Sequence, residues 1–199
     1  MSRWPGIEGP GSPWQLRRRW QWRRQRARLA AVQLLVLDVD GVLTDGGLWY
    51  GPQGELIKRF DVRDGLGIRL LQQAGIEVAL LSGGSGGATE ERARHLGIRH
   101  CLVGAADKPR ALEGLQASLG MAPEATAFVG DDVNDLAVRG RVSLLLATAD
   151  AAEPLRRRAD LVLQRAGGNG AVRELAERLL RFTPLWQEIE SQGWRERNG

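Results

Sequence analysis

Between residues 34 and 181 the sequence alternates short apolar runs with longer amphipathic stretches, and this alternation limits the fold more than any other feature. The apolar runs predict strands at 34–37, 77–81, 100–103, 126–129, 142–147 and 160–163. The amphipathic stretches predict helices at 65–73, 86–96, 108–119, 133–139, 151–157 and 170–181. Such alternation is typical of a parallel sheet covered by helices on both faces. Right-handed crossovers then give a three-layer α/β/α, doubly wound fold.

One segment departs from this rhythm. Residues 48–50 and 55–60 have the composition of two short strands, and between them lies Gly51-Pro52-Gln53-Gly54. A Pro/Gly turn between two such runs indicates a β-hairpin. We expect this hairpin to project from the sheet, and no insertion is long enough to form a cap domain.

The 199 residues suit one domain with appendages. We divide the chain into a basic Trp/Arg-rich arm at 1–30, a core domain at 31–182 and a C-terminal tail at 183–199. The arm is expected to be poorly ordered, although residues 20–32 are compatible with a short helix leading into the core. The net charge of +4 comes from arginines in this arm. It therefore says little about the ligand of the core, and we expect no nucleic-acid partner.

The cellular setting follows from cysteine use and hydropathy. The single cysteine, Cys101, cannot form an intramolecular disulfide and lies in an apolar run, where a small core residue is the expected role. No run approaches the roughly 20 apolar residues of a membrane span, and the N-terminus lacks the apolar middle segment of a secretory signal. A cytoplasmic protein is therefore expected.

Chemically active side chains follow the predicted strands at their carboxyl ends. Strand 34–37 runs into Asp38 and Asp40, and strand 126–129 runs into Gly130-Asp131-Asp132-Val133-Asn134-Asp135. Strand 77–81 ends in Ser82-Gly83-Gly84, and Lys108 opens the helical stretch 108–119, which follows strand 100–103. Ligands of doubly wound sheets bind at this edge. An isolated Asp-x-Asp would more simply be a helix cap or a turn, but here the acids, the hydroxyl and the lysine share one edge.

These side chains are the parts that phosphoryl transfer requires. A carboxylate nucleophile divides hydrolysis into two steps. A hard divalent cation offsets the repulsion between carboxylate and phosphate, a general acid protonates the leaving oxygen, and fixed donors hold the phosphoryl oxygens. The pattern thus favours a phosphatase.

The sequence resembles the haloacid dehalogenase-like phosphatases, whose first motif reads Asp-x-Asp-Gly-x-x-Thr/Val. The four motifs of that family appear in order as residues 38–44, Ser82, Lys108 and residues 130–135. The resemblance covers roughly residues 34 to 180 and extends to the capless branch that contains 3-deoxy-D-manno-octulosonate 8-phosphate phosphatases. Segments 60–65, 96–98 and 167–174 carry this closer resemblance.

The resemblance implies a role for each motif residue. Asp38 would attack phosphorus, and Asp40 would protonate the leaving alcohol and then activate water. Mg²⁺ would be held by the Asp38 carboxylate, the Asp40 backbone carbonyl and Asp131. The phosphoryl oxygens would bind Ser82, Gly83 and Lys108, with Asp132 and Asp135 in support. The hairpin falls where that branch has its tetramerising hairpin, so the resemblance also implies a homotetramer.

The expected substrate is a phosphorylated sugar or sugar acid, with 3-deoxy-D-manno-octulosonate 8-phosphate as the first choice. Where the octulosonate enzymes carry Thr-Gly-Arg, this chain has Ser82-Gly83-Gly84, which leaves another sugar phosphate or a nonulosonate phosphate as alternatives. A non-catalytic binding module acting through the basic arm is the alternative of another class. Arg63 and Asp64 are equally compatible with substrate binding and with a surface salt bridge.

Overall fold

The computed structural model describes residues 20–53, 56–181 and 183–194, and its centre is a six-stranded parallel sheet. The strands lie in the order β5-β4-β1-β6-β7-β8. Their bounds are β1 Leu34–Leu37, β4 Glu77–Leu81, β5 His100–Leu102, β6 Thr126–Gly130, β7 Leu144–Ala147 and β8 Leu161–Val162. The predicted parallel sheet is confirmed, with strand ends differing by one or two residues.

Strand β1 lies at the centre, where the strand order reverses. It pairs with β4 on one side and with β6 on the other, in parallel register throughout. After β1 the chain builds β4 and β5 outward, then returns to build β6, β7 and β8 on the opposite side. In such sheets the crevice beyond the carboxyl ends at this switch point is where ligands bind, and β1 leads directly to Asp38.

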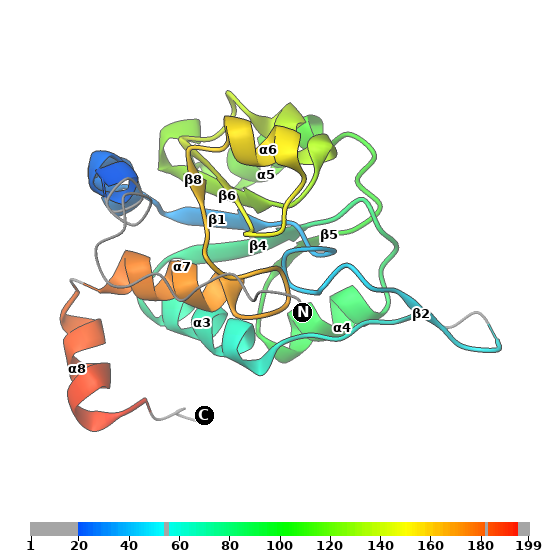
Figure 1. The fold of residues 1–199 in the computed structure, drawn as a ribbon, viewed down its shortest axis with the longest axis horizontal. Helices are drawn as coiled ribbons and strands as arrows, with labels where there is room; N and C mark the ends of the chain where they lie inside the picture. Colours follow the sequence, from blue (N-terminus) through cyan, green and yellow to red (C-terminus); the bar gives the residue numbers. More distant parts are fainter. Residues whose placement is uncertain (1–19, 54–55, 182, 195–199) are drawn as a thin grey trace, which may run out of the picture.

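Helices cover both faces of the sheet (Figure 1). Helices α3 (Val62–Gln73), α4 (Ala88–His95) and α7 (Ala171–Leu180) pack on one face. The opposite face carries α5 (Lys108–Leu119), the 3₁₀ helix η2 (Val133–Val138) and α6 (Glu153–Arg158). The expected three-layer α/β/α architecture is therefore confirmed.

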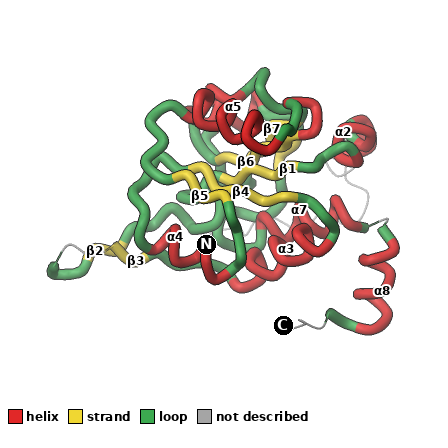
Figure 2. The backbone as a smooth tube through the Cα atoms, turned by 180° about the vertical axis from the view of Figure 1, so that it is seen from behind, coloured by secondary structure: helices red, strands yellow, loops and turns green. Residues whose placement is uncertain are grey.

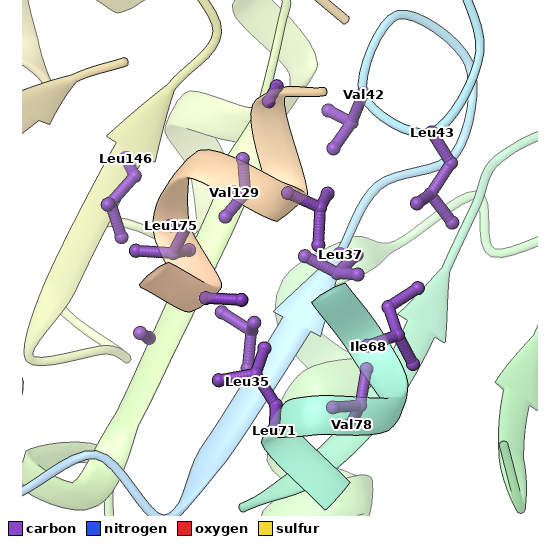
Figure 3. Packing of buried hydrophobic residues seen from close by; sticks show 14 of the residues in the cluster. Leu35, Leu37, Val42, Leu43, Ile68, Leu71, Val78, Val129, Leu146 and Leu175 are labelled. Carbon is purple, nitrogen blue, oxygen red and sulfur yellow. The ribbon is translucent and has the colours of Figure 1, made fainter. Parts of the chain in front are cut away.

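The strands divide their apolar side chains between two cores because successive side chains of a strand point to opposite faces. Leu35 and Leu37 of β1 pack with Ile68 of α3 and Leu175 of α7 (Figure 3). Leu34 and Val36 of the same strand lie in the second core, with residues of α5 and α6. Full burial of each such side chain contributes about 1.5–3 kcal/mol, so both helical layers hold β1 in place.

The predicted hairpin is present and projects from the body of the protein (Figure 2). Its strands β2 (Trp49–Tyr50) and β3 (Leu56–Ile57) pair antiparallel, with Trp49 opposite Ile57. Both strands are shorter than predicted because the hairpin packs on no second layer within the described chain, and short two-stranded ribbons are weak alone.

The two ends of the described chain are helical. Residues 20–24 and α2 (Arg26–Ala30) fall within the predicted helix, while the rest of the arm, residues 1–19, lies outside the described residues. The expected C-terminal tail contains helix α8 (Pro184–Gln192), which the sequence reasoning missed; the Thr183 hydroxyl caps it by accepting a hydrogen bond from the Trp186 N–H. A short 3₁₀ turn, η1 (Pro123–Ala125), precedes β6. Within the described chain, no helix combines the length and hydropathy needed to cross a bilayer.

Candidate active site

The candidate active site lies at the carboxyl end of β1, where the first motif aspartate continues the sheet by one residue. The N–H of Asp38 donates to the carbonyl of Val129 at 3.0 Å, as the residues of β1 donate to β6. Its Oδ1 accepts from the N–H of Val39 at 2.7 Å. These bonds fix the carboxylate over the end of β6, and only 5% of Asp38 is exposed.

Lys108 joins two acidic motifs from the first turn of α5. Its ammonium group lies 2.8 Å from Oδ2 of Asp38 and 2.6 Å from Oδ1 of Asp135. The preceding residue, Asp107, caps the helix by accepting a hydrogen bond from the Arg110 N–H. Burial opposes the charge of Lys108, but the two carboxylates outweigh it and raise its pKa. Lys108 therefore stays protonated within the site.

Asp135 organises the loop that follows β6. Its Oδ2 accepts hydrogen bonds from the backbone N–H groups of Asp131, at 2.9 Å, and Asp132, at 3.4 Å. The loop closes tightly, because a Cβ atom on Gly130 would lie 2.2 Å from that oxygen. Asp132 is exposed and caps η2 through the Val133 N–H. Asp135 thus holds the loop after β6 through backbone amides, and Asp132 caps the helix that follows.

The carboxylates of Asp38, Asp131 and Asp135 come within 4.8 Å of one another. Among the described residues, the Asp131 carboxylate accepts no hydrogen bond, whereas both oxygens of Asp135 are already engaged. Burial, with the charges of Asp38 and Asp135, raises the pKa of Asp131 to about 7. Burial and the charge of Asp135 raise the pKa of Asp38 to about 6 despite the opposing Lys108.

This excess of negative charge fits a hard divalent cation. Carboxylate and carbonyl oxygens are the donors that such ions take, and a cation between Asp38 and Asp131 would relieve their mutual repulsion. The predicted ligands Asp38, Asp40 and Asp131 all lie at this edge, on the loops after β1 and β6. The donor set therefore suits Mg²⁺.

The loop after β4 supplies the predicted phosphate-binding groups. Ser82 is buried, and its N–H donates to the carbonyl of Leu102, the last residue of β5. The Ser82 Oγ accepts from the N–H of Gly84 at 3.1 Å, which orients the hydroxyl and leaves its proton for another acceptor. Gly83 is exposed beside it. Hydroxyl and backbone donors on one loop can hold an anion.

The chain is similar to known proteins over most of its length. Residues 55–138 match the haloacid dehalogenase-like hydrolases. The chain is 46% identical over 166 residues to 3-deoxy-D-manno-octulosonate 8-phosphate phosphatase from Escherichia coli, an alignment covering 83% of this chain and 88% of that protein. The chain belongs to the haloacid dehalogenase-like hydrolases.

Solved structures agree with this membership. The octulosonate 8-phosphate phosphatase from Yersinia pestis is 42% identical, with a TM-score of 0.77, and the match covers 82% of this chain and 87% of that one. The enzyme of that name from Moraxella catarrhalis, solved with magnesium, phosphate and KDO, is 34% identical with a TM-score of 0.77. That match covers 86% of this hydrolase and 95% of the relative.

Arg63 and Asp64 of this hydrolase do not form the ion pair considered as their structural alternative. Arg63 pairs instead with Asp61, the N-cap of α3, at 2.6 Å. Asp64 is buried, and its two oxygens accept from the N–H groups of Gly170, at 3.1 Å, and Arg173, at 2.9 Å. These contacts favour a structural role for Asp64 at the start of α7, whereas the exposed Arg63 guanidinium remains available to a ligand.

Two features of this hydrolase's site were not assigned from the sequence. Lys58 donates to Oδ2 of Asp40 at 2.8 Å, and a lone lysine after a hairpin carries no signal of such a contact. The glycine loop before α7 packs directly on the loop of the first motif: the Gly168 N–H donates to the Val42 carbonyl, and a Cβ on Gly167 would lie 1.8 Å from the Gly41 oxygen.

Proposed function

We propose that this chain is a Mg²⁺-dependent phosphatase that hydrolyses 3-deoxy-D-manno-octulosonate 8-phosphate to KDO and phosphate. The observation that carries the proposal is the placement of Lys108 between Asp38 and Asp135, beside the Asp131 carboxylate, which accepts no hydrogen bond from the residues that the structure describes. The proposed nucleophile, a fixed cation and a proposed metal ligand thus share one edge of the sheet. The similarity to octulosonate 8-phosphate phosphatases over most of both chains supports the substrate.

The Asp38 carboxylate, the Asp40 backbone carbonyl and the Asp131 carboxylate would hold Mg²⁺. When bound, the ion neutralises charge between the nucleophile and the phosphoryl group. The relative from Moraxella catarrhalis, whose structure contains magnesium and phosphate, supports this assignment.

Asp38 begins the reaction by attacking phosphorus through a carboxylate oxygen. The P–O bond to the sugar breaks, and the leaving alkoxide takes a proton from Asp40, which gives an aspartyl phosphate and the free alcohol. Asp40, now ionised, accepts a proton from water as that water attacks the same phosphorus. Phosphate leaves, Asp38 is regenerated, and Asp40 is protonated again.

Lys108 and the Ser82 loop serve the phosphoryl oxygens. The ammonium group of Lys108 lies beside the carboxylate of Asp38, and its ion pair with Asp135 holds it in that position. The Ser82 hydroxyl and the Gly83 N–H are donors on the neighbouring loop. Because such donors are fixed before substrate arrives, they stabilise the developing charge without reorganisation.

Position 84 favours a second candidate, the hydrolysis of another sugar phosphate. A Cβ atom on Gly84 would lie 3.0 Å from Oδ2 of Asp40 and 3.4 Å from Oγ of Ser82. A side chain at this position would therefore lie next to Asp40 and Ser82, within the candidate site. Glycine leaves that space open and supplies no charge to a substrate carboxylate.

A homotetramer assembled through the hairpin, located in the cytoplasm, completes the proposal. Trp49, Tyr50 and Ile57 on the hairpin are 68%, 72% and 58% exposed, respectively, which is more apolar surface than a free ribbon should present to water. Burying it against other copies would also enclose an active site that has no cap domain. The partly buried free thiol of Cys101 suits a reducing compartment.

A phosphate-release screen tests the function. Purified protein with Mg²⁺ should release phosphate from octulosonate 8-phosphate with a kcat/KM at least about tenfold above that for neutral sugar phosphates. A preference for a neutral sugar phosphate would support the second candidate. Release from no phosphate monoester, by protein that binds Mg²⁺ and is folded, would refute both.

A further inference from the structure

Lys58, which follows strand β3, is buried in a way that lysine seldom is. Its side chain is 0% exposed, whereas its neighbours Ile57 and Arg59 are exposed. Lysine is almost never fully buried unless its charge is paired. An ammonium group withdrawn from water is costly unless carboxylates or hydroxyls satisfy it. The surroundings of Lys58 must therefore compensate its charge.

Two side chains do so, and they come from different parts of the fold. The Nζ of Lys58 donates to Oδ2 of Asp40 at 2.8 Å and to Oγ1 of Thr89 at 3.3 Å. Asp40 stands on the loop after β1, and Thr89 is buried in the first turn of α4. Lys58 thus joins the end of the hairpin to the proposed proton donor and to the helix after the Ser82 loop.

The two carboxylate oxygens of Asp40 differ in their hydrogen bonding. Oδ2 is held by Lys58, while Oδ1 is buried and accepts no hydrogen bond from any described residue. The backbone at Gly84 lies close to the pair, since a Cβ there would be 3.7 Å from Nζ of Lys58. A single charge-assisted bond to Oδ2 therefore restrains the orientation of a carboxyl group whose side chain is 32% exposed.

We propose that Lys58 is a positioning residue for proton transfer: it holds the carboxyl group of Asp40 in the orientation that delivers a proton to the leaving oxygen. A general acid must lie within about 2.6–3.2 Å of the atom it protonates, so a freely rotating carboxyl loses efficiency. Lys58 touches no substrate, because its side chain is fully enclosed. This inference rests on the proposed phosphatase function and adds the group that orients its acid.

The test compares substrates that differ in their need for a proton. A sugar phosphate releases a basic alkoxide, whereas p-nitrophenyl phosphate releases a stable phenolate that needs no general acid. The quantity compared is kcat/KM, which ends with loss of the leaving group and does not include the later attack of water. Lys58→Met should lower kcat/KM for the sugar phosphate by about 10- to 100-fold and for p-nitrophenyl phosphate by less than about threefold.

Three further variants complete the design. Thr89→Val removes only the second partner of Lys58. It should also lower kcat/KM more for the sugar phosphate than for p-nitrophenyl phosphate, but by a smaller factor, and it replaces Lys58→Met in the test if that variant folds poorly. Lys58→Met placed on Asp40→Asn should cause no further loss with the sugar phosphate. Arg99→Met removes an exposed ion pair with Glu77, which lies at the opposite end of β4 from the site. This variant should leave kcat/KM unchanged for both substrates.

The outcomes separate this inference from the function on which it rests. If both Lys58→Met and Thr89→Val lower kcat/KM equally for the two substrates, or change neither, Lys58 does not position the acid, although the chain is still a phosphatase. If the unaltered protein hydrolyses neither substrate with Mg²⁺, the phosphatase proposal fails, and the role of Lys58 fails with it.

Discussion

Gly41 and Asp131 lie so close that a Cβ atom on Gly41 would stand 2.0 Å from Oδ2 of Asp131. Gly41 also has a φ of +85°, in the left-handed region that side chains disfavour. The glycine of the first motif therefore does more than turn the chain. Its missing side chain provides the space in which the carboxylate of the fourth motif approaches Asp38.

Gly41→Ala should consequently remove metal-dependent activity while the protein remains folded. The added methyl group displaces the Asp131 side chain, and we expect kcat/KM at limiting Mg²⁺ to fall by roughly 100-fold or more. Gly75→Ala is the matched control, because Gly75 has a φ of +82° and, apart from its chain neighbours, no described residue lies within 4 Å of its Cβ position. Both variants should lose roughly 1–2 kcal/mol of stability from the strained backbone. Equal Mg²⁺ affinity in the two would contradict this account.

Asp38→Asn should lower turnover by roughly three orders of magnitude or more. The amide is nearly isosteric with the carboxylate but is a poor nucleophile and a poor metal ligand. The fold should persist, because burial already disfavours the charge of Asp38 and Lys108 keeps Asp135 as a partner. Circular dichroism checks the fold, and phosphate release checks the rate. Turnover equal to that of the unaltered protein would rule out Asp38 as the nucleophile.

Stabilisation by Mg²⁺ should grow as the pH rises from about 4 to about 7. Burial and neighbouring carboxylates raise the pKa of Asp131 from 3.8 to about 7, so in this window the metal-free folded protein holds a proton that the unfolded chain has released. The free energy of unfolding without metal therefore falls as pH rises. Mg²⁺ needs the ionised carboxylates and restores this loss. Melting temperatures with Mg²⁺ and with chelator should differ more at about pH 8 than at about pH 5.5; an equal difference would contradict the proposed site.

Asp64→Ala should lower the free energy of unfolding and leave the KM for the substrate unchanged. The substitution leaves the buried N–H of Gly170 and the partly buried N–H of Arg173 without their acceptor, at a cost of about 1–3 kcal/mol in the free energy of unfolding. Urea denaturation measures this cost, with the exposed Asp45→Ala as a control expected within about 0.5 kcal/mol of the unaltered protein. An unchanged stability together with a raised KM would support the substrate-binding role instead.

Charged residues on the hairpin should reduce both assembly and activity. Trp49 and Ile57 face each other across β2 and β3 and are exposed, so Glu at both positions would introduce charge into any interface formed there. Light scattering should show smaller species, with kcat/KM reduced by roughly tenfold or more because the site loses its cover. Ala74→Glu, at the end of α3, is the control expected to keep the assembly. A fully active monomer of the unaltered protein would disprove the shared-site idea.

Much of the fold was predictable because its signals are local. The bounds of β1, β4 and α5 agree with their apolar runs and caps, since a buried parallel strand needs a continuous apolar run and a helix needs a defined start. Helix α8 was missed because its signal, Thr183 before Pro184, is short and lies at the start of the segment assigned to the C-terminal tail. The ends of the hairpin strands were overestimated because pairing length depends on neighbours that the local sequence does not reveal.

The sequence by itself determined which chemical groups the site contains: Asp38, Lys108 and the acids after β6 follow strand ends, and parallel strands bring those ends to one edge. Only the tertiary structure decided which of these groups contact one another. That Lys108 bridges two carboxylates, that Asp64 holds backbone amides, and that Lys58 reaches Asp40 all depend on contacts between residues distant in the chain. Side-chain pairing of this kind is set by packing geometry across layers, and no local pattern encodes it.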